Sequence, residues 1–269
     1  MSSMLPKVFV VTVCRNAGTL LEPTLKSVLS QSYANMEYVL VDGASTDGTK
    51  QIISQYASLD DSRICYWVSE PDKGIYDAMN KALCWIDQRL ASDPASAQSA
   101  WVNFMNAGDL FADEKVLDEV FGPEGSLAHS QSASSCLVIG GNTVNMLASG
   151  GSEVHHAEPA SVLPVRLPFS HQACFVRVGH NAPQVCLKSG HWQFDRDYPI
   201  AADYNLLYKI FWKHGAESFL ILDKPIACYR QEGSTSLDNA KRTKGEYLAI
   251  QSSHLSWRWV KEYLKWRWL

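Results

Sequence analysis

Three segments near the start of the chain repeat one pattern: a short apolar run rich in β-branched residues, a polar loop, and apolar residues at helical spacing. The runs lie at residues 7–13, 38–41 and 64–68. Strands that alternate with helices in this way predict an α/β fold with a parallel, Rossmann-like sheet covered by helices on both faces. Ligands of such sheets bind beyond the carboxyl ends of the strands. The polar loops are therefore candidate binding loops.

The alternation weakens after a fourth expected strand at residues 101–105. Residues 122–165 are rich in Ser, Gly, Ala and His around a strand-like stretch at 136–139, so we expect mixed strands and loops there. The remaining expectations are a strand at 169–178, a helix at 201–213, and a pair of strands at 219–229 that is broken at Asp223-Lys224-Pro225.

The size and composition favour one main domain. The chain has 269 residues, of which 46% are hydrophobic and 19% charged, and no long linker divides it. We place this domain at residues 1–236, with a first half up to about residue 121 and a second half from about residue 122. Residues 237–269 form a C-terminal helical tail. The net charge of −4 provides no basic field for nucleic acid, which we therefore do not expect as a partner.

Cysteine usage and the lack of leader-like segments indicate the compartment. The seven cysteines form neither a CxxC pair nor an even set, which favours reduced thiols. The first residues lack the pattern of a secretion signal. No stretch reaches the roughly 18 apolar residues that a membrane-spanning helix needs. We expect a cytoplasmic protein that does not cross a bilayer.

Five polar segments stand at expected strand ends or helix starts. They read VTVCRN from residue 11, VDGASTDGT from 41, EPDKGIYDAMN from 70, FMNAGD from 104 and IAADY from 200. In this order they resemble the motifs of family-2 glycosyltransferases with the GT-A fold, over residues 8 to about 236. The resemblance is strongest to bacterial exopolysaccharide transferases, such as those of colanic acid clusters.

This resemblance implies an activity, with a nucleotide-binding half up to about residue 121 and an acceptor half at about 122–236. Family members transfer a sugar from a nucleotide-diphosphate donor to a hydroxyl of a polysaccharide or a lipid-linked glycan, and inversion at the anomeric carbon is implied by the family. Such a reaction needs a base for the hydroxyl proton and positive charge for the departing diphosphate. Asp203 in IAADY corresponds to the family's catalytic base. By its position alone it could equally cap a helix.

The first three motifs supply candidate donor-binding residues. The resemblance assigns Thr12 and Asp42 to the donor, with Asp42 on the nucleobase or ribose, although spacing alone favours an Asx turn or helix cap for Asp42. Asp47 is expected to cap the following helix. Asp72 resembles the family's residue near the nucleobase, and Lys73 either neutralises phosphate or is a solvated loop charge.

The fourth motif departs from the family pattern. Many relatives carry Asp-x-Asp here, whereas this chain has Asn106 and Gly108, which leaves Asp109 as the carboxylate of the loop. A divalent ion, Mg²⁺ or Mn²⁺, would then rely on the donor diphosphate and water for its other ligands, as Mg²⁺ commonly does. The alternative is a turn in which Asp109 caps the helix near Asp113.

Two later residues complete the candidate site. His171, in a segment that resembles the family's acceptor side, is assigned to the diphosphate or metal, with a hydrogen-bonded structural histidine as the alternative. Arg230 opens a segment that resembles the family's late mobile loop, where it would contact the diphosphate. The adjacent pair His155 and His156 lacks a third partner at metal-ligand spacing.

The C-terminal segment carries a separate signal. Residues 254–269 hold four tryptophans and four Lys or Arg residues, a composition typical of a helix at an anionic membrane surface. Such a helix would bring the enzyme to the inner face of the membrane, beside a lipid-linked acceptor. A terminal helix packed on the protein core is the alternative.

Two other functions share parts of this pattern. A sugar nucleotidyltransferase would need a Gly-rich, basic loop after the first strand, and residues 14–18 contain one glycine. A non-catalytic nucleotide-sugar-binding or scaffold protein at the membrane is compatible with the reduced metal motif. A Rossmann oxidoreductase is disfavoured because no G-x-G-x-x-G opens the first helix.

Overall fold

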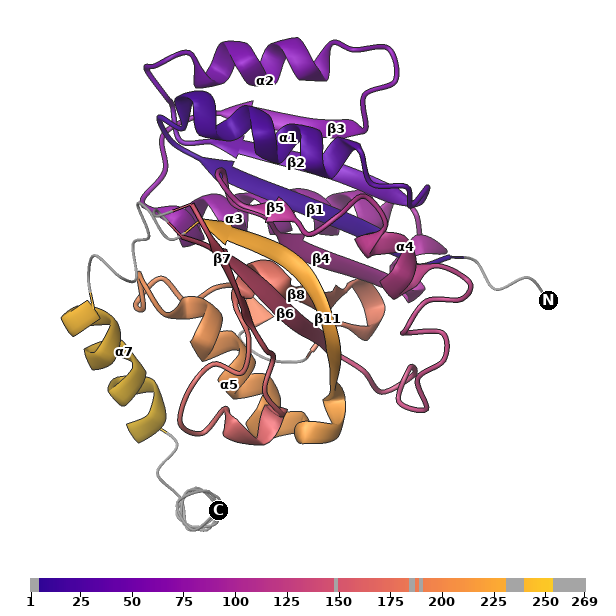
Figure 1. Cartoon of the computed structure of the whole chain (residues 1–269), viewed down its shortest axis with the longest axis vertical. Coiled ribbons are helices and arrows are strands. Elements are labelled where there is room, and N and C mark those ends of the chain that lie inside the picture. Colours follow the sequence, from indigo (N-terminus) through magenta and orange to yellow (C-terminus); the bar gives the residue numbers. More distant parts are fainter. Residues whose placement is uncertain (1–4, 148–149, 184–186, 189–190, 231–239, 254–269) are drawn as a thin grey trace.

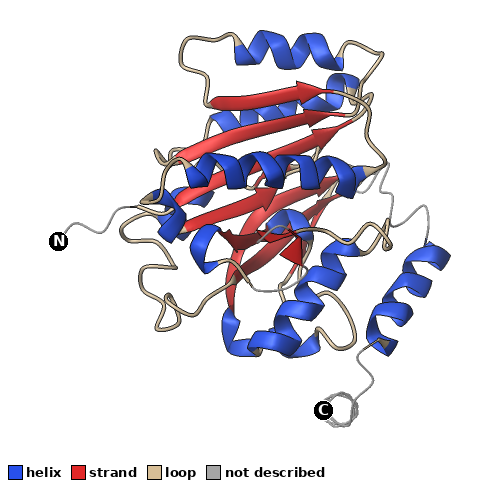
Figure 2. Ribbon diagram, turned by 180° about the vertical axis from the view of Figure 1, so that it is seen from behind, coloured by secondary structure: helices blue, strands red, loops and turns tan. Residues whose placement is uncertain are grey.

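The fold is given by a computed structural model that describes residues 5–147, 150–183, 187–188, 191–230 and 240–253. Its centre is a nine-stranded sheet in the order β3-β2-β1-β4-β8-β6-β11-β5, with β7 paired to β6. Helices lie on both faces of this sheet (Figures 1 and 2). The α/β class and the flanking helices expected from the sequence are confirmed.

The first half of the chain forms the parallel part of the sheet. Strands β1, β2, β3 and β4 pair in parallel, with Val11 opposite Val39 on one side and Phe104 on the other. The elements are β1 (Lys7–Cys14), α1 (Leu21–Leu29), β2 (Met36–Asp42), α2 (Thr49–Ala57), β3 (Ile64–Ser69), α3 (Ile75–Ala91) and β4 (Ala100–Phe104). The four expected strand–loop units are present.

Burial on both faces explains why residues 8–11 of β1 are all apolar. Phe9 and Val11 point into the core that includes Ile86 of α3, whereas Val8 and Val10 point into the core on the α1 side. All five side chains are fully buried. Successive strand residues face opposite sides, so a central parallel strand needs a continuous apolar run. Each such side chain contributes roughly 1.5–3 kcal/mol when buried.

The second half adds mostly antiparallel strands. β8 lies antiparallel between β4 and β6, while β11 runs parallel to β6 and antiparallel to β5. The elements are β5 (Leu110–Phe111), α4 (Val116–Phe121), β6 (Val138–Met146), β7 (Ser152–His155), β8 (Cys174–Val178), α5 (Ala202–His214), β11 (Phe219–Arg230) and α7 (Ala240–Ser252), with β9 (Leu187–Lys188) and β10 (His191–Trp192) as a separate hairpin.

Three expectations for this half need correction. The strand pair expected at 219–229 is one strand, β11, whose register against β6 shifts on both sides of Pro225. Proline has no N–H for the ladder, and an irregularity in the pairing accommodates it. The strand expected at 169–178 begins only at Cys174, because residues 171–173 form a 3-10 turn. Of the stretch expected at 136–139 only residues 138 and 139 are in a strand, β6, which extends to Met146.

Helix α7 packs beside α5 (Figure 1). Its Ile250 is fully buried, and Tyr247 stacks on Tyr204 of α5 with ring centroids 4.2 Å apart. In the described part of the chain no helix is both long and apolar enough to span a bilayer. The six cysteines described there are all free thiols. The aromatic segment at 254–269 lies outside the described residues.

Candidate active site

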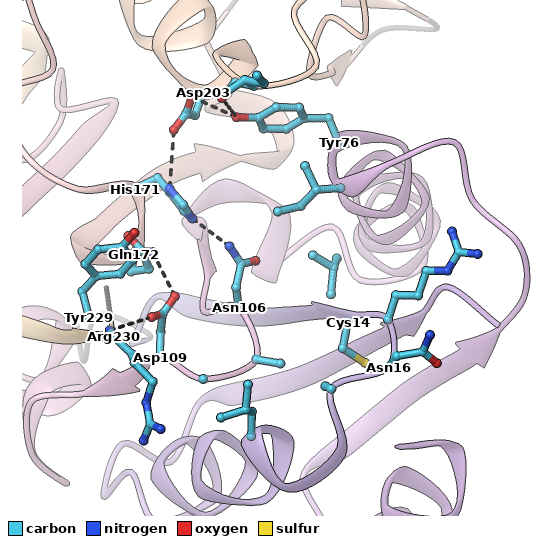
Figure 3. A pocket seen from close by; sticks show the side chains of 18 of the residues that line it. Cys14, Asn16, Tyr76, Asn106, Asp109, His171, Gln172, Asp203, Tyr229 and Arg230 are labelled. Atoms are coloured by element: carbon cyan, nitrogen blue, oxygen red, sulfur yellow. Dashed lines mark hydrogen bonds and ion pairs between the residues drawn. The ribbon is translucent and has the colours of Figure 1, made fainter. Parts of the chain in front are cut away.

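A cavity of about 350 Å³ lies where the polar loops converge, at the carboxyl ends of β1 and β4. The 3-10 turn at 171–173, the start of α5 and the end of β11 close its other side (Figure 3). Residues from four of the five sequence motifs line it, among them Asn16, Tyr76, Asp109 and Asp203. The topology thus brings the motifs together at the edge of the sheet predicted to bind ligands.

Asp203 faces this cavity from the first turn of α5. Its Oδ1 accepts hydrogen bonds from the backbone N–H of Tyr204 at 2.8 Å and from the Tyr76 hydroxyl at 3.0 Å. The carboxyl is 15% exposed. Burial, together with the charge of Asp203, raises the pKa of Tyr76 well above its ordinary value, so Tyr76 stays a donor at neutral pH. The carboxylate is oriented while one oxygen faces the cavity.

His171 connects Asp203 to the fourth-motif loop. Its Nδ1 lies 3.5 Å from Asp203 Oδ2, and its Nε2 lies 2.9 Å from Asn106 Nδ2 (Figure 3). Burial alone would lower the pKa of His171, but the Asp203 hydrogen bond and the charges of Asp203 and Asp109 outweigh it and raise that pKa above 6.5. The neighbouring carboxylates therefore favour a proton on His171 more than on an unperturbed histidine.

Asp109 is the buried carboxylate of the fourth-motif loop. It is 5% exposed, and its oxygens accept hydrogen bonds from Gln172 Nε2 at 2.9 Å and from the Arg230 backbone N–H at 3.3 Å. Burial raises the pKa of Asp109 above its ordinary value, against the lowering effects of the Gln172 bond and of the charges of His171 and Arg230. The alternative role as a helix cap is wrong, because α4 begins at Val116.

The residues around Asp109 fit a divalent ion that takes most of its ligands from outside the protein. Among the described residues, no cluster of three or more His, Cys, Asp or Glu side chains could hold a metal. Within that same part of the chain, Asp109 has no ion pair. Burial raises the pKa of Asp109 even though the charges of His171 and Arg230 act against it, so a further positive charge would stabilise the ionised carboxylate. Mg²⁺ or Mn²⁺ bound by Asp109, diphosphate and water would supply one.

Asp42 and Thr12 lie behind the cavity rather than on its wall. Asp42 is fully buried and accepts hydrogen bonds from the N–H and hydroxyl of Ser45 and from the Ser69 hydroxyl. This arrangement matches the Asx-turn alternative. Thr12 is fully buried, and its hydroxyl donates to the carbonyl of Met105 at 2.6 Å. Asp42 thus fixes the loop that follows β2, and Thr12 ties β1 to the start of the loop that follows β4.

The third-motif loop lies beside the Asp42 loop. Asp72 accepts the N–H of Gly74 at 2.8 Å, and its Oδ2 lies where a Cβ on Gly43 would collide with it. Lys73 is exposed and does not line the cavity. Asp47 accepts hydrogen bonds from the N–H and hydroxyl of Thr49 at the start of α2, which confirms its expected capping role.

Three lining residues were missed in the sequence. Tyr76 and Asn106 stand inside the recognised motifs, but nothing in their spacing shows that they reach Asp203 and His171. Gln172 follows His171, and only the fold brings it to Asp109. Arg230, which was expected at the diphosphate, does line the cavity.

Comparison with known proteins relates the first half of the chain to a family of enzymes. Residues 9–121 match the model of glycosyl transferase family 2. The resemblance expected from the motifs is thereby confirmed. The putative teichuronic acid biosynthesis glycosyltransferase TuaG of Bacillus subtilis is 35% identical over 116 residues, 43% of this chain and 41% of that protein. The putative glycosyltransferase EpsE of the same organism is 40% identical over 78 residues, 29% of this chain and 28% of that protein.

Solved structures extend the likeness beyond the matched region. S. aureus TarS 1-349 in complex with UDP superposes with a TM-score of 0.60 at 15% identity, covering 95% of this chain and 68% of that one. The mannosyltransferase PcManGT from Pyrobaculum calidifontis, in complex with GDP-Man and Mn²⁺, gives 0.60 at 18% identity over 93% of this chain and 64% of that one. The GT-A fold is confirmed. The sequence alignments span less than half the length of the curated relatives named above.

Proposed function

We propose that the chain is an inverting glycosyltransferase that moves a sugar from a nucleotide-diphosphate donor to a hydroxyl of a polysaccharide or lipid-linked glycan. The observation that carries this proposal is that Asp203 and Asp109 face one cavity at the carboxyl ends of β1 and β4. The same cavity lies on a domain whose first half matches the model of a glycosyltransferase family. A base and a site for positive charge are what the reaction needs.

In the proposed mechanism Asp203 accepts the proton of the acceptor hydroxyl. That oxygen attacks the anomeric carbon, the bond from this carbon to the diphosphate oxygen breaks, and the nucleotide diphosphate leaves. Tyr76 holds Asp203 Oδ1 and leaves Oδ2 toward His171 and the cavity. A divalent ion held by Asp109 would stabilise the diphosphate charge when bound.

The donor would enter from the side of the first three motif loops. We assign Arg230 and His171, which line the cavity, to the diphosphate, and the exposed Lys73 of the third-motif loop to the part of the donor outside the cavity. Asp72 is assigned to the nucleobase side. Thr12 and Asp42 serve the donor through the loops that they hold, since both are fully buried.

A thermal-shift panel tests donor binding. UDP-glucose, UDP-N-acetylglucosamine and GDP-mannose are compared with and without Mg²⁺ or Mn²⁺. A donor at 100 times its dissociation constant adds about 2.7 kcal/mol of stability. We expect one nucleotide class to raise the melting temperature, more so with the metal ion. No shift with any donor would contradict the proposal.

Release of nucleotide diphosphate separates an enzyme from a binding protein. The replacement of Asp-x-Asp by a loop with a single ionised carboxylate favours a non-catalytic nucleotide-sugar-binding protein as a second candidate. We expect slow hydrolysis of the bound donor by water when Mn²⁺ is present. Donor binding without any release would favour the second candidate.

Residues 254–269 are proposed to place the protein on an anionic membrane beside its acceptor. The four basic residues of this segment would each contribute around 1 kcal/mol near such a surface. A chain ending at residue 253 should lose binding to anionic vesicles and keep donor hydrolysis. Unfolding of the shortened chain would favour a helix packed on the core, and unchanged vesicle binding would place the membrane contact elsewhere.

A further inference from the structure

Helix α7 contacts the segment that carries Asp203. The Glu246 carboxylate accepts two hydrogen bonds through Oε2, from the backbone N–H groups of Ile200 and Ala201, each at 3.0 Å. These two residues immediately precede α5, and Asp203 is the second residue of that helix. The contact joins residues 46 and 45 positions apart in the chain.

The start of α5 lacks a cap of its own. The N-cap residue is Ala201, whose side chain makes no cap hydrogen bond. A carboxylate near a helix N-terminus is favoured by the helix dipole, and charge-assisted bonds to backbone N–H groups are stronger than neutral ones. The Glu246 side chain is 12% exposed, so water competes weakly for these bonds. Glu246 therefore supplies, from another helix, a side-chain hydrogen-bond acceptor that alanine does not have.

The opposite side of the segment is held by α3. The Tyr76 hydroxyl lies 2.9 Å from the Ile200 carbonyl oxygen and 3.0 Å from Asp203 Oδ1. Residues 200–203 are thus held by hydrogen bonds with the Tyr76 hydroxyl and with the Glu246 carboxylate. Two further contacts fix α7 in place: Gln251 Nε2 donates to the Val165 carbonyl and to the Tyr204 hydroxyl, both at 3.0 Å.

α7 also reaches a second cavity that shares Asp203 and His171 with the first. This cavity, of about 270 Å³, is lined by Thr243 and Tyr247 of α7. Glu246 lines neither cavity. Any effect of Glu246 on the reaction must therefore pass through the backbone that it binds.

From these contacts we infer that Glu246 is a positioning residue for Asp203, and that α7 is part of the catalytic unit. The inference rests on the proposed function, in which Asp203 is the base. A displacement of about 1 Å in a reacting group can cost about a hundredfold in rate. Loss of the two bonds to Ile200 and Ala201 frees the segment that sets the place of Asp203.

The test measures kcat and donor KM for hydrolysis of whichever nucleotide sugar of the panel the wild type cleaves fastest, with Mn²⁺ and with water as acceptor. Glu246→Ala should lower kcat at least tenfold and leave the donor KM within twofold. Glu246→Gln keeps an amide oxygen that can accept both N–H groups, so it should stay within about threefold of the wild-type kcat. The matched control is Arg242→Ala, which removes only the ion pair to Glu246 Oε1.

Glu246→Asp covers the case in which the alanine variant does not fold. It keeps the charge but is one methylene too short to reach both N–H groups, so kcat should fall several-fold at an unchanged donor KM. Equal kcat in wild type, Glu246→Ala and Glu246→Asp would overturn the role of Glu246 while leaving the proposed function intact. A rise in donor KM that matches the fall in kcat/KM would also overturn it. No hydrolysis by the wild type would remove the proposed function and this inference together.

Discussion

The two halves of the molecule place their carboxylates in different ways. Asp42, in the first half, is fully buried, and its partners Ser45 and Ser69 are 3 and 27 residues away. Asp203, in the second half, faces the cavity and is held by Tyr76, 127 residues away. In the first arrangement both oxygens of the Asp42 carboxylate accept hydrogen bonds from Ser45 and Ser69. The second orients a carboxylate and leaves part of it available for chemistry.

This difference indicates that the two halves of the chain have different roles in the site. The first half matches the family model over residues 9–121 and presents regular loops at the ends of parallel strands. The second half contributes His171, Asp203 and Arg230 through antiparallel strands and a 3-10 turn. We therefore expect variants of the second half to alter the reaction step, and variants of the Asp42 loop to alter folding and donor binding.

The largest expected effect is that of Asp203→Asn. The amide keeps an oxygen for the Tyr76 hydroxyl but cannot accept a proton at neutral pH, so kcat for donor hydrolysis should fall by about 10²–10⁴-fold. Donor affinity in the thermal-shift assay should stay nearly unchanged. Asp77→Asn, which removes a carboxylate paired with Arg196, is the matched control. A kcat close to that of the wild type would refute the assignment of the base.

Asp109→Ala should have the next largest effect. Removing the carboxylate proposed to hold the ion should weaken Mn²⁺-dependent donor binding by at least the roughly 10–100-fold that loss of an outer-shell metal partner costs. Titration of UDP with and without Mn²⁺, for wild type and variant, measures this difference. If the wild type bound and cleaved its donor equally well in chelator, the ion would have no part in the reaction.

The smallest effect concerns stability and pH. The raised pKa of His171 means that the folded state binds its proton more tightly than the unfolded state does. The resulting stabilisation is fully present below pH 6.5 and is lost as the pH rises through the folded-state pKa. The free energy of unfolding of the wild type should thus exceed that of His171→Gln most at low pH. Urea unfolding between pH 5.5 and pH 8.5, on the order of three pH units around the ordinary value, measures the difference. A gap that widens with pH would contradict the assignment.

What the sequence could predict follows the same division. The strand–loop units of the first half were predictable because burial on both faces demands continuous apolar runs such as residues 8–11. The strands of the second half were harder to predict from the sequence. Asn142 of β6 donates to Asp223 beside Pro225, where β11 is irregular, and such pairing between distant strands leaves no local periodicity.

The site shows the same limit. The motifs located Asp203, Asp109, His171 and Arg230 at one cavity. They did not show that Thr12 and Asp42 turn inward, because a buried and an exposed polar residue at a strand end look alike in sequence. Nor did they reveal Glu246, whose role depends on a helix that packs against α5 from outside the recognised motifs.

The stereochemistry of donor cleavage tests the account most directly. In a single displacement assisted by Asp203, an α-linked donor such as UDP-glucose, or whichever α-linked nucleotide sugar the panel selects, must release the β-anomer first. Proton NMR of the fresh products distinguishes the anomers before they equilibrate. We predict an initial β-anomer signal that appears with Mn²⁺ and is absent with Asp203→Asn. An initial α-anomer, or a bound donor that is never cleaved, would contradict the account.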